Sequence, residues 1–278
     1  IQFSDIEVQT QLSRMQKGKA ADLQGFTVEL IQWGGSSLVS TLTTCLNQVV
    51  QCGLPQDWST RRLVPIHKGG SKKEVSNYRT IMVASIFAKV LGGLLEARLS
   101  SWVERHKKRA SSQAGFRAGF STLDHMLCLR VLEEGAKRRK LPLFCLFVDF
   151  SKAFDKVCRH KLWERLISLQ VPLEMRIAIA QLYQKVVIRF SGTSFEEVPN
   201  TLGVIQGCPL SPTLFGVFID QLHDLLEEMG GAGSQLGALA IQLLIFADDV
   251  VLLAHSQSDL QKHLLALEHF CKQSGMQV

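Results

Sequence analysis

Two adjacent aspartates, Asp248 and Asp249, lie between two short apolar segments, residues 243–246 and 250–253. Both segments are rich in residues that favour strands, so the sequence predicts a β-hairpin with the acidic pair at its turn. A third aspartate, Asp149, directly follows another apolar segment of the same character. If the three strands are neighbours in one sheet, three carboxylates meet at one edge of that sheet.

Three carboxylates in this position predict a metal site. Burying unpaired carboxylates beside apolar strands is costly, so we expect the side chains to face a cleft and to bind a divalent cation. A ligand set made only of hard oxygen atoms favours Mg²⁺ or Mn²⁺ over Zn²⁺. Two such ions, roughly 3.5–4 Å apart, support phosphoryl transfer. Taken alone, an Asp-Asp pair indicates turn geometry more often than a metal site, because aspartate favours turns.

The composition is consistent with a folded protein that contacts a polyanion. The chain has 278 residues, 46% of them hydrophobic, which suffices for one large domain or two closely joined ones. Its formal net charge is +6, and the basic residues are clustered at 61–62, 68–73, 105–109, 137–140 and 159–161. Such clusters suit contact with phosphates. The alternative is that they are solvated helix ends and loops.

The cysteines and the ends of the chain predict its context. The seven cysteines form no C-x-x-C pair, and most have apolar neighbours, so we expect reduced thiols, no disulfide partner and an intracellular protein. No apolar segment approaches the length of a membrane span, which predicts no membrane association. Because the chain begins with Ile1 and stops at Val278, we expect it to be a fragment of a longer protein.

The hydrophobic pattern predicts a mixture of helices and strands. The first 140 residues read mainly as helices separated by basic loops. Helices are predicted at 39–52, 88–103, 124–137, 151–168, 173–185 and 209–228. Further strands are predicted at 63–66 and 186–190.

Five motifs, in this order, resemble those of one family. Residues 146–155 (LFVDFSKAFD), 203–212 (GVIQGCPLSP) and 246–249 (FADD) resemble the three core motifs of reverse transcriptases. The residues within these motifs resemble those of non-LTR (LINE-type) retrotransposons in particular. Upstream, residues 65–79 (PIHKG…NYR) and 113–117 (QAGFR) resemble the finger motifs of the same family. The resemblance covers residues 15 to 278, and the five motifs together are far more specific than any one of them.

The resemblance implies an α+β fold, a right-hand polymerase fragment. It implies a helical fingers region over residues 1–142 and a palm region over 143–278, in which an antiparallel sheet packs on helices. The chain stops before the expected primer grip and thumb. Three departures from the family pattern are Thr80 in place of proline, Ile205 in place of a basic residue, and displaced polar residues at 22–25.

The resemblance also implies roles for particular residues. Asp149, Asp248 and Asp249 would be the catalytic residues and the ligands of two Mg²⁺ or Mn²⁺ ions. The nucleotide-binding residues would be Lys68, Arg79, Phe150, Phe154, Gln206 and Gly207, and the template-binding residues Gly115, Phe116 and Arg117. Phe154 matches the steric gate that selects deoxynucleotides, although a core residue of an amphipathic helix is an equal alternative from the sequence.

The function implied is RNA-directed DNA polymerase activity, in which dNMP is transferred to a primer 3′-hydroxyl. The partners would be an RNA template, a DNA primer, dNTPs and other domains of a longer polyprotein. The location would be intracellular, and nuclear within an active element. One alternative is a catalytically inactive remnant that only binds nucleic acid. A second is an RNA-dependent RNA polymerase, against which Phe154 and the FADD motif argue.

Overall fold

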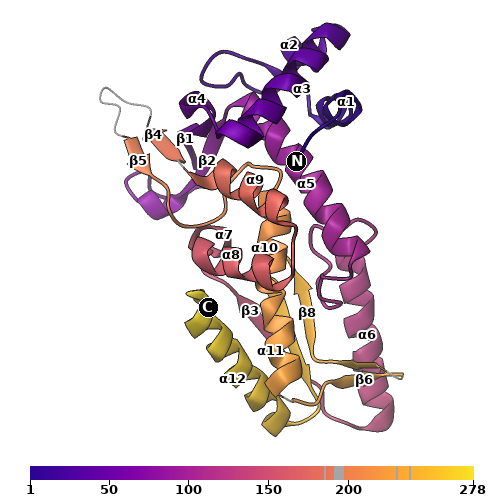
Figure 1. Ribbon diagram of the computed structural model, residues 1–278. Helices are drawn as coiled ribbons and strands as arrows, with labels where there is room; N and C mark the ends of the chain where they lie inside the picture. Colours follow the sequence, from indigo (N-terminus) through magenta and orange to yellow (C-terminus); the bar gives the residue numbers. More distant parts are fainter. Residues whose placement is uncertain (185, 191–196, 230, 238) are drawn as a thin grey trace. The chain divides into compact units, whose positions relative to one another are not determined.

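The computed structural model (Figure 1) describes residues 1–278 except 185, 191–196, 230 and 238. The chain forms two units, each assembled from two stretches of sequence. Unit 1 comprises Ile1–Trp102 and Gln170–Ser211, and unit 2 comprises Val103–Leu169 and Pro212–Val278. The units therefore interleave along the chain. The fingers and palm boundary at residues 142/143 stays a prediction.

Unit 1 contains a four-stranded sheet with the order β2-β1-β4-β5. Strand β1 pairs with β2 in antiparallel and with β4 in parallel orientation, and β4 pairs with β5 in antiparallel orientation. The strands are β1 (Thr60–His67), β2 (Tyr78–Ala84), β4 (Val187–Phe190) and β5 (Glu197–Pro199). The helices are α1 (Asp5–Arg14), α2 (Val28–Gln32), α3 (Gly35–Cys52), α4 (Gln56–Ser59), the 3₁₀ helix η1 (Val75–Asn77), most of α5 (Ile86–Arg105) and α9 (Leu173–Gln184).

Unit 2 contains the sheet that carries the aspartates, with the order β3-β9-β8, and a separate pair, β6-β7. The strands are β3 (Phe144–Asp149), β6 (Ser234–Leu236), β7 (Leu239–Ile241), β8 (Leu243–Phe246) and β9 (Asp249–Ala254). The helices are α6 (Thr122–Arg139), α7 (Ala153–Lys156), α8 (Arg159–Ser168), α10 (Ser211–Ile219, whose first residue belongs to unit 1), α11 (Gln221–Met229) and α12 (Gln257–Ser274).

Helices pack on both faces of the β3-β9-β8 sheet because its strands carry apolar residues on both faces. On one face, Leu132 of α6 packs with Leu244 of β8 and Leu253 of β9. On the other side, α12 contacts β9, and the buried Phe270 of α12 packs edge-on against Phe150. The cover by α6 does not reach the whole of β3, where Cys145 and Phe147 are exposed.

Most elements expected from the sequence are confirmed. The helices expected at 39–52, 88–103 and 124–137 correspond to α3, α5 and α6, and the strand expected at 63–66 is the centre of β1. Helix α9 matches the helix expected at 173–185 as far as Gln184, and residue 185 lies outside the described part of the chain. The strand expected at 186–190 is β4. Within the described ranges, none of the helices combines the length and the apolar character that a membrane span needs.

Two of the expected helices are wrong as single elements. The helix expected at 151–168 is divided into α7 and α8, because the chain leaves helical backbone at Val157 (φ −55°, ψ 117°), whose side chain is fully buried. The helix expected at 209–228 is divided into α10 and α11 at Asp220. The carboxylate of Asp220 accepts hydrogen bonds from Arg109 and from the backbone N–H of Ala110.

Some clustered basic residues are buried instead of facing a polyanion. Arg61, Arg109 and Arg159 are 1%, 8% and 9% exposed, so the prediction of phosphate contact is wrong for these three side chains. Burial lowers the pKa of Arg61. Lys72, Lys73 and the residues at 137–140 are exposed, in keeping with either phosphate contact or a solvated surface.

The ion pair between Arg109 and Asp220 is the most deeply buried one among the described residues of unit 2. Its Nε–Oδ2 distance is 2.7 Å, and the two side chains are 2% and 1% exposed. Burial raises the pKa of Asp220, and the charge of Arg109 opposes that shift. Gly216 leaves room for the guanidinium, because a Cβ there would lie 2.3 Å from Arg109 Nη2.

We expect Asp220→Ala to lower the free energy of unfolding by about 3–5 kcal/mol, because it leaves the Arg109 charge buried and unpaired. Chemical denaturation of the purified chain measures this loss. The control is Glu133→Ala, which removes an exposed ion pair with Lys137 and should change stability little. Equal losses in the two variants would show that the buried pair has no special importance.

Candidate active site

The three aspartates lie at one edge of the β3-β9-β8 sheet. In the antiparallel pairing of β3 with β9, Asp149 is opposite Asp249. In the pairing of β8 with β9, Phe246 is opposite Asp249, so Ala247 and Asp248 form a two-residue turn. The prediction that the aspartates lie at adjacent strand ends of one antiparallel sheet is confirmed.

The aspartates influence one another electrostatically. Asp149 and Asp249 are exposed, and Asp248 is partly buried. The pKa of Asp248 is raised, first by its burial and then by the negative charges of Asp249 and Asp149, while a hydrogen bond with the backbone opposes the shift. No cationic side chain contributes to this shift. The edge of the sheet therefore concentrates negative charge that a bound cation would stabilise.

The chemistry of the three carboxylates fits a divalent metal, although their side chains are not arranged in a coordination geometry. All three ligands offer carboxylate oxygens, which Mg²⁺ and Mn²⁺ prefer. Among the residues that the structure describes, no group of three or more His, Cys, Asp or Glu side chains has an arrangement that could hold a metal ion. Side-chain rotation at the aspartates would have to accompany metal binding.

The turn that carries Asp248 has an unusual backbone. Ala247 has a φ of +59°, in the left-handed region that residues other than glycine, asparagine and aspartate rarely adopt. A positive φ at the first residue of a two-residue hairpin loop matches the right-handed twist of the strands. The turn therefore suits the hairpin, but alanine makes it strained.

Of the three predicted template-binding residues, Gly115 lies against this turn. A Cβ on Gly115 would lie 2.2 Å from the backbone nitrogen of Ala247, so only glycine fits there. Phe116 is half exposed, and its ring meets that of Phe154 edge-on at 6.1 Å. The guanidinium of Arg117 is mostly buried, with Nε 2.7 Å from Glu104 Oε1, and it lowers the pKa of Glu104.

The two predicted nucleotide-binding aromatics of unit 2 differ in exposure. Phe150 is 3% exposed, so its ring is part of the core. Phe154 lies on α7, is partly buried, and stacks on Phe215 with ring centroids 4.3 Å apart and planes at 13°. The stack fixes the orientation of the Phe154 ring, which both a steric gate and a core residue require.

The other four predicted nucleotide-binding residues belong to unit 1. Lys68 is exposed directly after β1, and its backbone N–H donates to the carbonyl of Asn77 at 2.7 Å. Arg79 lies on β2 opposite Ile66, and its side chain is outside the described part of the structure. Gln206 is partly buried. Gly207 has a φ of +80°.

Sequence reasoning missed Gln113 as a residue of the site. Its side chain is fully buried, and its Oε1 accepts a hydrogen bond from the backbone N–H of Ala247 at 3.1 Å. The two residues are 134 positions apart, so no local pattern could have revealed the contact. The one available signal was the place of Gln113 at the start of the QAGFR motif.

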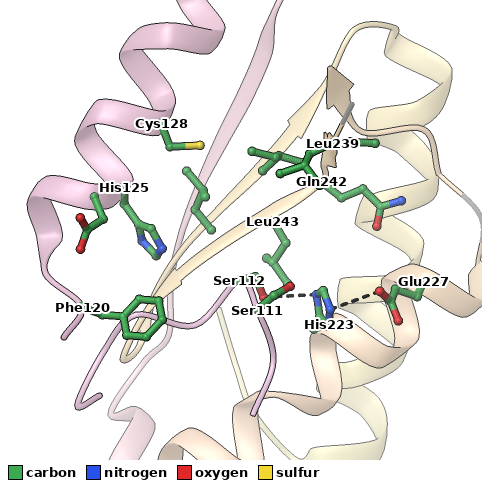
Figure 2. Close-up of a pocket in the computed structure, with 14 residues that line it drawn as sticks. Ser111, Ser112, Phe120, His125, Cys128, His223, Glu227, Leu239, Gln242 and Leu243 are labelled. Atoms are coloured by element: carbon green, nitrogen blue, oxygen red, sulfur yellow. Dashed lines mark hydrogen bonds and ion pairs between the residues drawn. The ribbon is translucent and has the colours of Figure 1, made fainter. Parts of the chain in front are cut away.

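A cavity of about 430 Å³ in unit 2 is separate from the predicted nucleotide-binding residues, none of which lines it. Figure 2 shows a polar row on its wall, in which Ser112 Oγ lies 3.2 Å from His223 Nδ1, and His223 Nε2 lies 3.3 Å from Glu227 Oε1. Burial lowers the pKa of His125, which also faces this space. No Lys or Arg is among the described residues that line it, so the cavity is poorly suited to a triphosphate.

Curated relatives include polyproteins of retrotransposable elements. The chain is 29% identical over 226 residues to the Pol polyprotein of a type-1 R2 element from Popillia japonica, covering 80% of this chain and 31% of that protein. It is 28% identical over 219 residues to the polyprotein of element R2DM from Drosophila melanogaster (78% and 20%). It is also 25% identical to a protein of transposon TX1 from Xenopus laevis (92% and 20%). The chain thus spans between a fifth and a third of the length of these relatives.

Solved structures support the fold class. The chain resembles apo telomerase from Candida tropicalis with a TM-score of 0.54 and 13% identity, over 84% of this chain and 52% of that one. Telomerase from Candida albicans gives a TM-score of 0.57 and 12% identity, over 88% and 44%. The α+β fold of a right-hand polymerase fragment is thereby confirmed. The family described as reverse transcriptase (RNA-dependent DNA polymerase) matches residues 66–278, most of the chain and all three aspartates, and the chain belongs to that family.

Proposed function

We propose that this chain carries out RNA-directed DNA synthesis, the transfer of dNMP to a primer 3′-hydroxyl. One observation carries the proposal: Asp149 and Asp249 are paired across β3 and β9, with Asp248 in the adjoining turn. Burial raises the pKa of Asp248, and the charges of Asp249 and Asp149 raise it further, which supports a shared acidic site.

The metal in this proposal is a pair of Mg²⁺ or Mn²⁺ ions bound by Asp149, Asp248 and Asp249. Family membership implies a general dependence on divalent metal. When bound, two such ions activate the attacking primer oxygen and stabilise the leaving pyrophosphate. The protein contributes the carboxylates, holds them at the end of an antiparallel sheet, and orients them through the hairpin turn.

Other residues contribute to substrate binding in this proposal. In unit 2, Phe154 selects the sugar with its ring, whereas Phe150 acts only through its backbone because its ring is buried. In unit 1, Lys68 and Arg79 bind the triphosphate, and Gln206 and Gly207 pack near the nucleotide. Gly207 suits this role because glycine allows the close approach of backbone to a ligand. Gly115, Phe116 and Arg117 shape the template path.

The proposed partners are an RNA template, a DNA primer, dNTPs and further domains of a polyprotein, and the proposed location is intracellular, and nuclear within an active element. The relatives, which include a retrovirus-related Pol polyprotein and a probable RNA-directed DNA polymerase of a transposon, support the partners. The alternative of an inactive remnant that only binds nucleic acid is not favoured, because the aspartates are intact and correctly paired.

Primer extension on an RNA template tests the proposal. We expect dNTP incorporation that requires Mg²⁺ or Mn²⁺, and a loss of at least about a hundredfold in Asp149→Asn, Asp248→Asn or Asp249→Asn, because each removes a metal ligand. Asp57→Asn, at an exposed position on α4, is the control and should retain activity. Template binding without any incorporation would support the alternative instead.

Asp248→Asn should also make the metal-free chain more stable at neutral pH. A raised pKa means that the folded chain binds the Asp248 proton more tightly, so ionisation destabilises the fold above the folded-state pKa. This deficit disappears below the unfolded pKa of about 3.9. Denaturation of wild type and variant at a series of pH values should therefore show a gain at pH 7 that shrinks in acid. Asp57→Asn is again the control, and a loss of stability at pH 7 would contradict the expectation.

Phe154→Val tests the steric gate. We expect the variant to incorporate ribonucleotides while largely keeping its use of deoxynucleotides, because the smaller side chain leaves space for a 2′-hydroxyl. The ratio of kcat/KM for dNTP to that for rNTP measures the effect. If a folded variant keeps the selectivity of wild type, Phe154 serves only the stack with Phe215.

A further inference from the structure

The segment from Arg109 to Arg117, here called the brace, pairs with the edge strand of the catalytic sheet. Ser112 accepts a hydrogen bond from the N–H of Ile245 at 2.8 Å, and the N–H of Ala114 donates to the carbonyl of Ile245 at 2.9 Å. Gln113 and Ile245 thereby form a parallel bridge. The edge of β8, two residues before the Ala247–Asp248 turn, is held by a segment distant in sequence.

One side chain of the brace reaches beyond the strand to the turn itself. Gln113 Oε1 accepts hydrogen bonds from the N–H of Ala247 at 3.1 Å and from the N–H of Gly115 at 2.6 Å. Gln113 is fully buried, and its Nε2 has no hydrogen-bond partner among the described residues. A buried amide with one unpaired end is unfavourable, so stability alone does not account for glutamine at this position.

The turn requires such an anchor because of its backbone. Ala247 is held at a φ of +59°. Strained conformations of this kind persist only where the surroundings determine them. The residue that follows is Asp248, and then Asp249, so any relaxation of Ala247 would move both carboxylates.

The brace is itself fixed at the other end. The N–H of Ala110 and the guanidinium of Arg109 bind the buried carboxylate of Asp220, at the break between α10 and α11. Ser112 Oγ contacts His223 of α11, as Figure 2 shows. Arg117 donates to the carbonyls of Ala110 and Gln113. The brace therefore connects the helical core of unit 2 to the catalytic turn.

We propose that Gln113 is a positioning residue for nucleotidyl transfer, which holds the Ala247 backbone so that Asp248 and Asp249 keep the geometry that the reaction needs. This inference rests on the proposed function. Gln113 acts through the turn and has no contact with substrate in this proposal. Its amide oxygen is a neutral acceptor, which avoids adding a fourth negative charge beside the three aspartates.

The test compares Gln113→Leu with wild type in primer extension on an RNA template. We expect kcat to fall by about ten- to a hundredfold, because small misplacements of catalytic groups have effects of this size. The KM for dNTP should change much less, and the Mg²⁺ concentration for half-maximal rate should rise. The matched control is Gln242→Leu, which removes a partly buried side-chain hydrogen bond to the carbonyl of Gly231 and should leave kcat unchanged.

Ala247→Gly shows whether Gln113 acts through the turn. Glycine adopts a positive φ without strain, so Ala247→Gly should restore much of the kcat lost in Gln113→Leu. Strictly additive effects in the double variant would overturn the inference. So would a kcat for folded Gln113→Leu equal to that of wild type.

A second variant keeps the inference testable if Gln113→Leu does not fold. Gly115→Ala leaves the Gln113 acceptor in place but puts a Cβ 2.2 Å from the Ala247 nitrogen, so it should lower kcat and weaken Mg²⁺ activation in the same way. Gly135→Ala on α6, where the nearest atom is 3.6 Å away in a flexible side chain, is its control. A Gly115→Ala enzyme with wild-type kcat would overturn the inference. An inactive wild type would instead refute the proposed function.

Discussion

The pairing of β3 with β9 is the constraint on which the rest of unit 2 depends. Five apolar pairs, from Phe144 opposite Ala254 to Val148 opposite Val250, precede the one pair of like charges, Asp149 opposite Asp249. Like charges directly opposite are destabilising, so the apolar pairs must hold the register against that repulsion. A slip of one residue would turn every side chain of β9 to the other face and separate the carboxylates.

Hydrophobic packing behind the catalytic edge offsets the unfavourable free energy of the edge itself. Three unfavourable features are concentrated there: the like charges of the aspartates, the positive φ of Ala247 and the unpaired Nε2 of Gln113. Away from the edge, α6 packs on β8 and β9, and Phe270 packs against both Phe150, which follows Asp149, and Phe218. Enzymes commonly place strain at the site and stability elsewhere.

The sequence predicted the acidic edge because the signal is local. Apolar strands directly before or after an aspartate can be recognised in a short stretch of sequence, and the family motifs identify which aspartates belong to one site. It did not predict the breaks at Val157 and Asp220, because burial of Val157 and the bond from Arg109 to Asp220 depend on tertiary contacts. For the same reason it treated Arg61 as a surface residue. Gln113 was missed because its partner is 134 residues away.

The same separation has a consequence for how the protein folds. The β8-β9 hairpin closes a two-residue loop, so it can form early and on its own. The hydrogen bond from Ala247 to Gln113 requires the closure of a far larger loop. Closing that loop lowers the conformational entropy of the chain before the contact can stabilise it. During synthesis the brace leaves the ribosome long before the hairpin that it supports. We therefore expect the turn that carries Asp248 to reach its final geometry after the hairpin has formed, once the segment from Arg109 to Arg117 is in place.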